Sequence, residues 1–190
     1  MCERVRSEFI LGGQRSGKSR RAEQLARDWL AAAPDHRAVL IATALAGDDE
    51  MQQRIARHQR DRAQRVPGLL TVEEPLALGA ALRRHTAPQT LVVIDCLTIW
   101  LTNWLMPLDG ATAEQGTANR AQEELLAALV QAPGPVVLVG NEIGLGVIPL
   151  GREVRAYVDV LGRLNQDVAA ACRRVTFMAA GLPLVMKEET

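Results

Sequence analysis

A segment of eight residues near the start of the chain constrains the fold more than any other part of the sequence. It matches the pattern G-x-x-x-x-G-K-[ST], which is typical of loops that bind nucleotide phosphates. The apolar run Glu8–Leu11 precedes it and the helical pattern Lys18–Ala32 follows it, as the phosphate-binding mechanism requires. We therefore expect this segment to bind ATP or GTP. Its residues are Gly12, Gly13, Gln14, Arg15, Ser16, Gly17, Lys18 and Ser19.

The fixed positions of the motif each have a chemical role. Gly12 and Gly17 permit backbone angles that a Cβ atom would oppose, so successive N–H groups can turn toward one phosphate. The helix that follows adds the positive end of its dipole. We expect Lys18 to reach the β- and γ-phosphates and the Ser19 hydroxyl to ligate Mg²⁺. Lys18 and Lys187 are the only lysines among 22 basic residues, which favours a site that needs a compact ammonium rather than a guanidinium.

Short apolar runs alternate with longer amphipathic segments along the whole chain, a pattern typical of α/β proteins. Most of the apolar runs lack alternation, as expected for strands that helices cover on both faces. We predict one domain, residues 1–190, with a three-layer P-loop (RecA-like) fold in which helices flank a mostly parallel central sheet. The expected strands are Glu8–Leu11, Val39–Ala42, Leu69–Val72, Leu91–Asp95, Val136–Val139, Val175–Ala179 and Leu184–Lys187, and the expected helices are Lys18–Ala32, Asp49–Arg65, Leu76–His85, Ala113–Val130 and Arg152–Arg173.

Composition and charge exclude several classes of function. Aromatic residues make up 3% of the chain, too few for the stacking platforms of many nucleic-acid binders. The net charge is zero, so no overall basic field attracts the chain to a nucleic acid or an anionic membrane. The sequence has neither a signal-peptide pattern nor an apolar run long enough to span a bilayer. Its three cysteines are widely spaced, which favours neither disulfides nor a zinc site. We expect a cytoplasmic protein.

Asp95 is a candidate for the acid that completes a magnesium site. It ends Leu91–Asp95, the most apolar of the expected strands, and an acid at the end of a neighbouring strand can hold the water shell of Mg²⁺. Taken alone, Asp95 could equally be the N-cap of a helix or a turn residue. The phosphate loop makes the metal role the preferred hypothesis.

The expected helix Asp49–Arg65 is strongly basic and carries one histidine. Met51, Ile55, His58 and Arg62 fall on one stripe, at spacings of four, three and four residues. Neighbouring arginines disfavour the imidazolium form of His58, and a neutral ring is what a nucleophile or general base requires. The alternative is a solvated helix whose histidine has no chemical role.

Four segments together resemble the bifunctional family of adenosylcobinamide kinase/adenosylcobinamide-phosphate guanylyltransferase enzymes of cobalamin biosynthesis. The resemblance covers nearly the full length, and the Asn-Glu-x-Gly-x-Gly segment is its most specific part. The segments are Gly12–Arg20; Ile41–Thr43 with Asp48–Met51, Arg54 and Ile55; Asp95–Thr98 with Trp100–Asn103; and Asn141–Pro149 with Gly162–Gln166.

The resemblance implies two activities. Family members phosphorylate the aminopropanol hydroxyl of adenosylcobinamide and then transfer GMP from GTP onto the new phosphate. The guanylyl group travels on a histidine that His58 matches; some relatives have another histidine where this chain has Arg57. The resemblance also implies a corrinoid substrate and a homo-oligomer, namely a trimer. By the same match, the residues near the nucleotide are Ala42, Thr43, Ala44, Gln59, Arg60, Asp61, Arg62, Glu73 and Asp95.

Other interpretations stay open from the sequence. Asn141–Pro149 either shapes the corrinoid side of the site or is an ordinary turn. The chain could be a small-molecule P-loop kinase with a single activity, in which His58 has no role. A RecA-like ATPase that acts on DNA would need a basic path for the nucleic acid, which the charge and composition do not provide.

Overall fold

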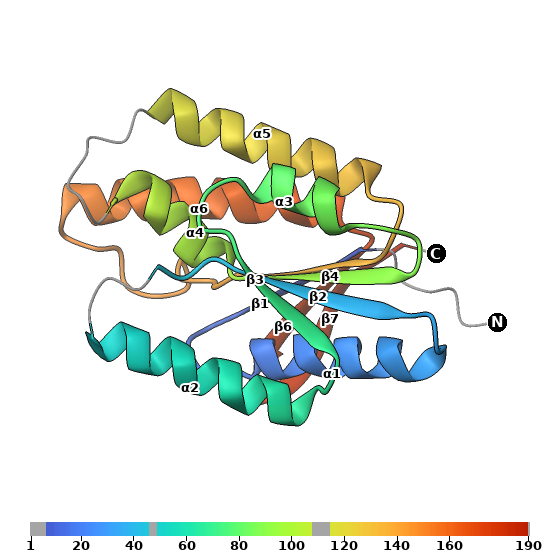
Figure 1. Ribbon diagram of the computed structural model, residues 1–190. Helices are drawn as coiled ribbons and strands as arrows, with labels where there is room; N and C mark the ends of the chain where they lie inside the picture. The colour runs from blue at the N-terminus through green and yellow to red at the C-terminus, as the bar shows by residue number, and fades with distance from the viewer. Residues whose placement is uncertain (1–6, 46–48, 108–114, 190) are drawn as a thin grey trace.

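The computed structural model describes residues 7–45, 49–107 and 115–189. In this part of the chain seven strands form one sheet, in the order β3-β2-β4-β5-β1-β6-β7 (Figure 1). The first six strands of the sequence run parallel, and β7 is antiparallel to β6. The strands are β1 Ser7–Gly12, β2 Arg37–Ala42, β3 Leu69–Glu73, β4 Thr90–Asp95, β5 Val136–Val139, β6 Arg174–Ala179 and β7 Leu182–Glu188.

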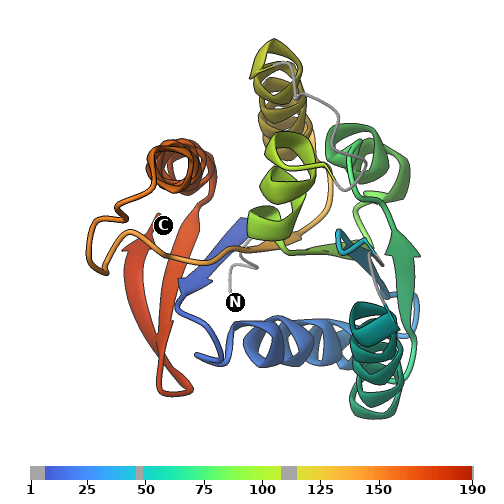
Figure 2. The same cartoon turned by 90° about the vertical axis from the view of Figure 1, so that its left-hand side faces the viewer.

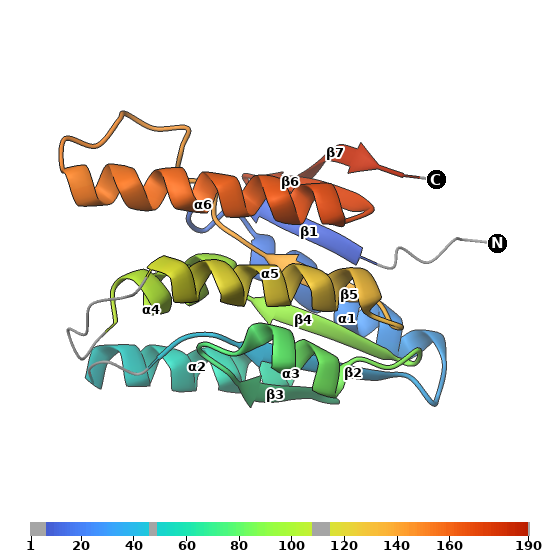
Figure 3. The ribbon, with the colours of Figure 1, turned by 90° about the horizontal axis from the view of Figure 1, so that it is seen from above.

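Helices cover both faces of the sheet. Figure 2 shows α1 and α2 on one face and α3, α4, α5 and α6 on the other. Viewed from above, α6, α5 and α3 succeed one another across the sheet (Figure 3). The predicted three-layer arrangement with a mostly parallel sheet is therefore confirmed. The helices are α1 Lys18–Ala32, α2 Asp49–Arg65, α3 Leu78–His85, α4 Leu97–Leu105, α5 Gln115–Gln131 and α6 Arg152–Ala171.

The strands β1, β2, β4 and β5 lack polar alternation because each of their faces packs against helices, whereas the edge strands β3 and β7 are more exposed. In β1, Phe9 belongs to the core under α3, α5 and α6, whereas Ile10 belongs to the core under α1. In β4, Ile94 and Val93 divide between the same two cores. All four residues are fully buried. The apolar runs of the sequence thus correspond to strands that are buried on both faces.

One helix is missing from the predicted set. Helix α4, Leu97–Leu105, follows directly after β4, and its sequence LTIWLTNWL has apolar residues on nearly all sides. Without a polar face it gives no 3.6-residue periodicity, and its N-cap is Cys96, which is not a preferred N-cap residue. Of the other predicted helices, the one at Leu76–His85 begins two residues later in the structure, and the one at Arg152–Arg173 ends at Ala171.

The register of the parallel strands aligns the ends that carry the predicted site. Glu73 of β3 pairs with Ala42 of β2, and Ala42 pairs with Asp95 of β4. Asp95 in turn pairs with Val139 of β5, which pairs with Ile10 of β1, two residues before the glycine that opens the phosphate loop. Residues that are far apart in the sequence are thus brought to one edge of the sheet.

Lys187, the second lysine of the chain, has a structural role. Its ammonium donates hydrogen bonds to three carbonyl oxygens at the end of α6, those of Ala169, Ala170 and Cys172, at 3.1, 3.0 and 2.7 Å. These carbonyls belong to the last turn of the helix and have no partner within it, so a cation with three donors stabilises the helix end. None of the helices in the described ranges is long and apolar enough to cross a membrane.

Candidate active site

The loop between β1 and α1 adopts a conformation that depends on its glycines. Gly12 has φ 152° and Gly17 has φ 104°, both in a region that side chains disfavour. A Cβ on Gly12 would also lie 2.4 Å from the carbonyl oxygen of Met178, and one on Gly17 would lie 3.1 Å from Gly181 Cα. Both predicted glycines are therefore required by backbone angle and by space.

Neighbouring segments hold this loop in place through backbone hydrogen bonds. The N–H of Gly181, in the turn between β6 and β7, donates to the Ser16 carbonyl at 3.0 Å. The N–H of Glu142, just after β5, donates to the Gly12 carbonyl at 3.2 Å. The loop is thus a fixed part of the sheet edge, which lowers the entropy cost of binding a ligand.

The Lys18 side chain is buried under the loop. Its ammonium donates to the carbonyl oxygens of Gly12 at 2.9 Å and Gly13 at 2.6 Å, and lies 3.5 Å from Ser16 Oγ. Burial lowers the pKa of Lys18, and the nearby Cys96 and Asp95 partly oppose this shift. An open hollow of about 240 Å³ lies over the loop, lined by residues 15–20. Of the loop residues, Gln14, Arg15 and Ser19 are exposed.

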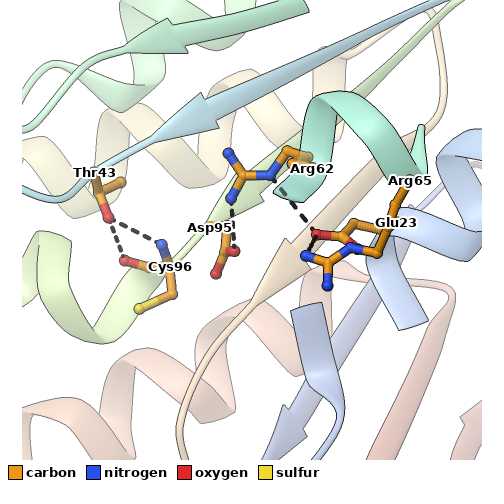
Figure 4. Close-up of polar contacts among 6 residues, drawn as sticks. All are labelled: Glu23, Thr43, Arg62, Arg65, Asp95 and Cys96. Atoms are coloured by element: carbon orange, nitrogen blue, oxygen red, sulfur yellow. Dashed lines mark hydrogen bonds and ion pairs between the residues drawn. The ribbon is translucent and has the colours of Figure 1, made fainter. Parts of the chain in front are cut away.

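Asp95 lies at the end of β4 with its carboxylate partly accessible, at 18% exposure of the side chain. The N-cap of α4 is Cys96, so the alternative role of Asp95 as that N-cap does not apply. The strand register places Asp95 beside Val139, whose partner on the other side is Ile10, two residues before Gly12 of the phosphate loop. The Oδ2 atom of Asp95 lies 3.8 Å from Nη2 of Arg62, which comes from α2 (Figure 4).

The donor set fits Mg²⁺. Among the described residues no three His, Cys, Asp or Glu side chains cluster as a metal cage. Ser19 and Asp95 would supply one hydroxyl and one carboxylate at the same edge of the sheet. Mg²⁺ is commonly held in this way, by one or two protein oxygens together with waters and substrate phosphates.

Thr43 and Cys96 fix the turn that follows β4. The Thr43 side chain is fully buried, and its Oγ1 accepts a hydrogen bond from the Cys96 N–H and donates one to the Cys96 carbonyl, each at 2.9 Å. Asn103 of α4 donates to the Thr43 carbonyl at 2.8 Å. Burial, reinforced by the charge of Asp95, raises the pKa of the Cys96 thiol to about 11. Cys96 is therefore a neutral packing residue at neutral pH.

Helix α2 is linked to the site by polar contacts. Arg62 is buried between Asp95 and Glu23 of α1 (Figure 4). Gln59 Nε2 donates to Glu73 Oε1 at 3.0 Å, which brings together two residues that the family resemblance placed near the nucleotide. Two further predicted residues, Arg60 and Asp61, have exposed side chains, and Ala44 is half-buried after β2. His58 lies within α2, but its side chain and that of Arg57 are outside the described part of the structure.

The segment Asn141–Pro149 begins next to the phosphate loop. The Asn141 N–H donates to Thr98 Oγ1 at 2.8 Å, and the Asn141 carbonyl accepts a hydrogen bond from Asn165 Nδ2 at 3.1 Å. Farther along, the segment presents apolar side chains to solvent. Those at least three-quarters exposed, counting the next residue after the segment, are Leu145, Val147, Ile148 and Leu150.

Two contributors to this arrangement were not predicted from the sequence. Glu23 is buried on α1, where Ser19, Glu23, Ala26 and Leu30 form a stripe at spacings of four, three and four residues. A glutamate on such a stripe is the signal that would have indicated a buried ion pair. Asn165, whose partner lies 24 residues away, had no local signal.

Residues 8–186 match the family model described as cobinamide kinase / cobinamide phosphate guanyltransferase. The chain is 48% identical over 182 residues to the bifunctional adenosylcobalamin biosynthesis protein CobP of Pseudomonas aeruginosa, covering 96% of this chain and 98% of that protein. It is 34% identical over 187 residues to CobU of Escherichia coli, covering 94% and 98%.

A solved structure also resembles the fold. The flagellar accessory protein FlaH from Methanocaldococcus jannaschii aligns with a TM-score of 0.53 and 10% sequence identity. The alignment covers 96% of this chain and 78% of FlaH. At that identity the likeness concerns the arrangement of the layers alone, and it agrees with the α/β fold predicted from the sequence.

Proposed function

This chain belongs to the cobinamide kinase / cobinamide phosphate guanyltransferase family, and on that premise we propose that its one nucleotide site performs two transfers in succession. The first phosphorylates the aminopropanol hydroxyl of adenosylcobinamide, with ATP or GTP as the donor. The second transfers GMP from GTP to adenosylcobinamide phosphate and yields adenosylcobinamide-GDP. We place both activities in one cytoplasmic domain.

In the kinase step the substrate hydroxyl attacks the γ-phosphorus and the nucleoside diphosphate leaves. Lys18 now bonds the carbonyl oxygens of Gly12 and Gly13, and a nucleotide offers it stronger, charge-assisted bonds to phosphate oxygens. The backbone N–H groups of the loop and the start of α1 bind the same phosphates. These groups stabilise the charge that develops on the leaving phosphate, which is the main protein contribution to phosphoryl transfer.

Ser19 and Asp95 are the residues that would hold Mg²⁺. When bound, the ion neutralises charge on the β- and γ-phosphate oxygens. The Asp95 carboxylate is accessible and close to Lys18, while Ser19 lies exposed in the first turn of α1. Their positions on adjoining segments support a shared ligand.

In the second step we propose that His58 is the nucleophile. A neutral imidazole nitrogen attacks the α-phosphorus of GTP, the bond to the β-phosphate oxygen breaks, and pyrophosphate leaves. A phosphate oxygen of the corrinoid substrate then attacks the guanylyl phosphorus and the P–N bond breaks, which restores His58. Dividing the transfer into two displacements allows one site to use two bulky partners in turn.

One observation carries this assignment of α2 to the site: Arg62 of α2 forms an ion pair with Asp95, the carboxylate beside the phosphate loop. His58 precedes Arg62 by four residues, one turn of the same helix. The helix that bears the proposed nucleophile is thus attached to the residues that bind the nucleotide phosphates.

Labelled GTP tests the proposal directly. Incubation with α-labelled GTP should leave radioactivity on the protein, whereas γ-labelled GTP should leave none, and intact mass should increase by one GMP. Phosphorylation of adenosylcobinamide without any protein adduct would instead indicate a kinase with a single activity.

We further propose that the protein is a homo-oligomer, a trimer as in the related family. Large apolar side chains that are exposed in the single chain support an interface, particularly on β7 and on the segment after β5. Sedimentation should then give three times the mass of 20.7 kDa, and a monomer would contradict the proposal. The residues on β7 are Leu182, Leu184, Val185 and Met186.

A further inference from the structure

Few of the described side chains of helix α2 are buried. Among its described side chains, Arg62 alone is buried and Gln59 is half-buried. The contacts of the described α2 side chains with the rest of the protein are therefore mainly polar. The exposed side chains are Gln52, Gln53, Ala56, Arg60, Asp61, Ala63, Gln64 and Arg65.

Glu23 of α1 supplies the most complete of these contacts. Its carboxylate accepts a two-point contact from Arg65, with Nε to Oε2 at 2.9 Å and Nη2 to Oε1 at 3.1 Å (Figure 4). The Glu23 side chain is 5% exposed and that of Arg65 is 43% exposed, so the carboxylate is the buried partner of the pair. Two parallel bonds between a guanidinium and a carboxylate fix orientation as well as distance.

The same carboxylate also lies near a second arginine. Glu23 Oε1 is 3.8 Å from Arg62 Nε, while Arg62 Nη2 is 3.8 Å from Asp95 Oδ2. Arg62 Nε is buried and has no hydrogen-bond partner, so its charge is balanced by the two carboxylates on either side. A buried arginine needs such partners, and loss of one leaves the charge uncompensated. Glu23 therefore interacts with both Arg65 and Arg62, and Arg62 is the residue that connects α2 to Asp95.

We propose that Glu23 is a positioning residue for guanylyl transfer, which sets the place of α2, and with it His58, relative to the phosphate loop. This inference rests on the proposed function. Glu23 lies in α1 five residues after Lys18, so α1 connects the phosphate-binding lysine to the anchor of α2. Because Glu23 acts through Arg62 and Arg65, it needs no contact with the substrate.

The proposal distinguishes the two reactions. Attack by His58 requires α2 to be held within a fraction of an ångström, because misplacement of a reacting group by about 1 Å can cost about a hundredfold in rate. Transfer of the γ-phosphoryl group to a substrate hydroxyl uses no nucleophile from α2. Loss of the Glu23 charge should therefore slow the first reaction far more than the second.

The test compares Glu23→Gln with Asp28→Asn. Both substitutions remove one charge from α1 and keep the shape of the side chain, but Asp28 is exposed and contacts Gln24 on its own helix. We expect Glu23→Gln to form the GMP adduct about 10- to 100-fold more slowly than the wild type. It should keep kinase kcat/KM within about threefold, because the loop is intact. Asp28→Asn should match the wild type in both rates.

Arg65→Gln is a second, independent test of the positioning role of Glu23. It removes the two-point contact from the other side, so it should slow adduct formation with the same sparing of the kinase. Adding it to Glu23→Gln should slow the reaction little further, because both changes break one contact. It carries the test by itself if Glu23→Gln does not fold. Backbone hydrogen exchange in residues 59–66 should be faster in either variant than in Asp28→Asn.

Three results would overturn the inference: adduct formation at the wild-type rate in a folded Glu23→Gln or Arg65→Gln protein, an equal loss of both activities, or strictly additive losses in the double variant. Failure of the proposed function has a different signature, since the wild-type protein itself would then form no GMP adduct. That result would remove the premise and the inference with it.

Discussion

Thr43, at the end of β2, and Cys96, at the start of the turn after β4, exchange two hydrogen bonds through the Thr43 hydroxyl. One hydroxyl satisfies both backbone groups of a buried residue that has no strand partner at that point. Thr43 thereby fixes the residue next to Asp95, the proposed magnesium ligand. The Thr43 side chain can in this way affect both reactions through Asp95.

Replacing Thr43 by Val should therefore destabilise the protein. The change keeps the shape but leaves the Cys96 N–H unpaired in the core, while the Cys96 carbonyl keeps only its bond from the Trp100 N–H, and this should cost about 2 kcal/mol. In a chain of this length that corresponds to a fall in Tm of about 4–8 °C. Thermal unfolding monitored by circular dichroism measures it. Thr43→Ser, which keeps the hydroxyl, should lose much less; an equal loss would show that the methyl group matters more than the hydrogen bonds.

Lys18→Ala should impair phosphorylation and guanylylation together. One loop is proposed to serve both reactions, and loss of a charge-assisted phosphate contact should cost about 3 kcal/mol, or about a hundredfold in rate. Steady-state assays of the two reactions measure this. The matched control is Lys187→Ala, which should lower Tm by removing the cap of α6 and leave both rates unchanged. Full retention of either activity in Lys18→Ala would point to a second nucleotide site.

Asp95→Asn should fold and bind nucleotide but turn over slowly. The lost interaction is with Mg²⁺, so raised Mg²⁺, or Mn²⁺, should partly restore the rate. Titration of activity against metal concentration at saturating nucleotide measures the effect. A variant that unfolds would instead place Asp95 in a structural role through its ion pair with Arg62.

His58→Ala should separate the two activities. It should lose the protein adduct and GMP transfer, and it should keep a substantial part of the kinase activity, which needs no protein nucleophile. The wild-type adduct should survive alkali and disappear in acid, as a phosphoramidate does. His85→Ala, in the last turn of α3, serves as the control. An undiminished adduct in His58→Ala would shift the search for the nucleophile to His36 and His85.

Cys96 and Cys172 should resist alkylation in the native protein. Burial raises the pKa of Cys172 from its ordinary value of 9.0 to about 12, and that of Cys96 to about 11. The thiolate is thus disfavoured in the folded state, so this contribution to stability is complete below pH 9 and is lost as the pH rises toward 11–12. Iodoacetamide at pH 8 should label both residues only after denaturation. Urea unfolding between pH 8 and 10 should show a shallower decline in Cys172→Ala than in the wild type.

The sequence was sufficient for the strands but not for every element around them. All seven strands were predicted because each is an apolar run: burial on both faces produces it in β1, β2, β4 and β5, and the more exposed edge strands β3 and β7 are also rich in apolar residues. Helix α4 was missed for the same physical reason: it is apolar on nearly all sides and gives no helical period. The helix ends at α3 and α6 differed by about a turn or less, because caps and neighbouring turns set them.

In the candidate site, too, some residues could be predicted from the sequence and others could not. The glycines, lysine and hydroxyl of the phosphate loop follow one another in the chain, so the motif is read directly from the sequence, and its binding of phosphate stays a prediction. Asp95 was predicted from its place at a strand end. Glu23 was not, because its partners Arg62 and Arg65 lie on another helix, which the position of Glu23 on the stripe of α1 does not identify. Contacts between distant segments depend on the strand order, which periodicity does not specify.

The antiparallel direction of β7 has a practical consequence for protein engineering. Glu8 near the start of β1 pairs with Arg174, which pairs with Glu188 at the end of β7, so these two strand ends lie together. The phosphate loop follows the opposite end of β1, so the start of β1 and the end of β7 lie away from it. An affinity tag, a fluorophore or a surface tether attached beyond either of these strand ends should therefore leave the phosphate loop accessible. An insertion between β6 and β7 should instead disturb the loop, because Gly181 donates a hydrogen bond to the Ser16 carbonyl and lies close to Gly17.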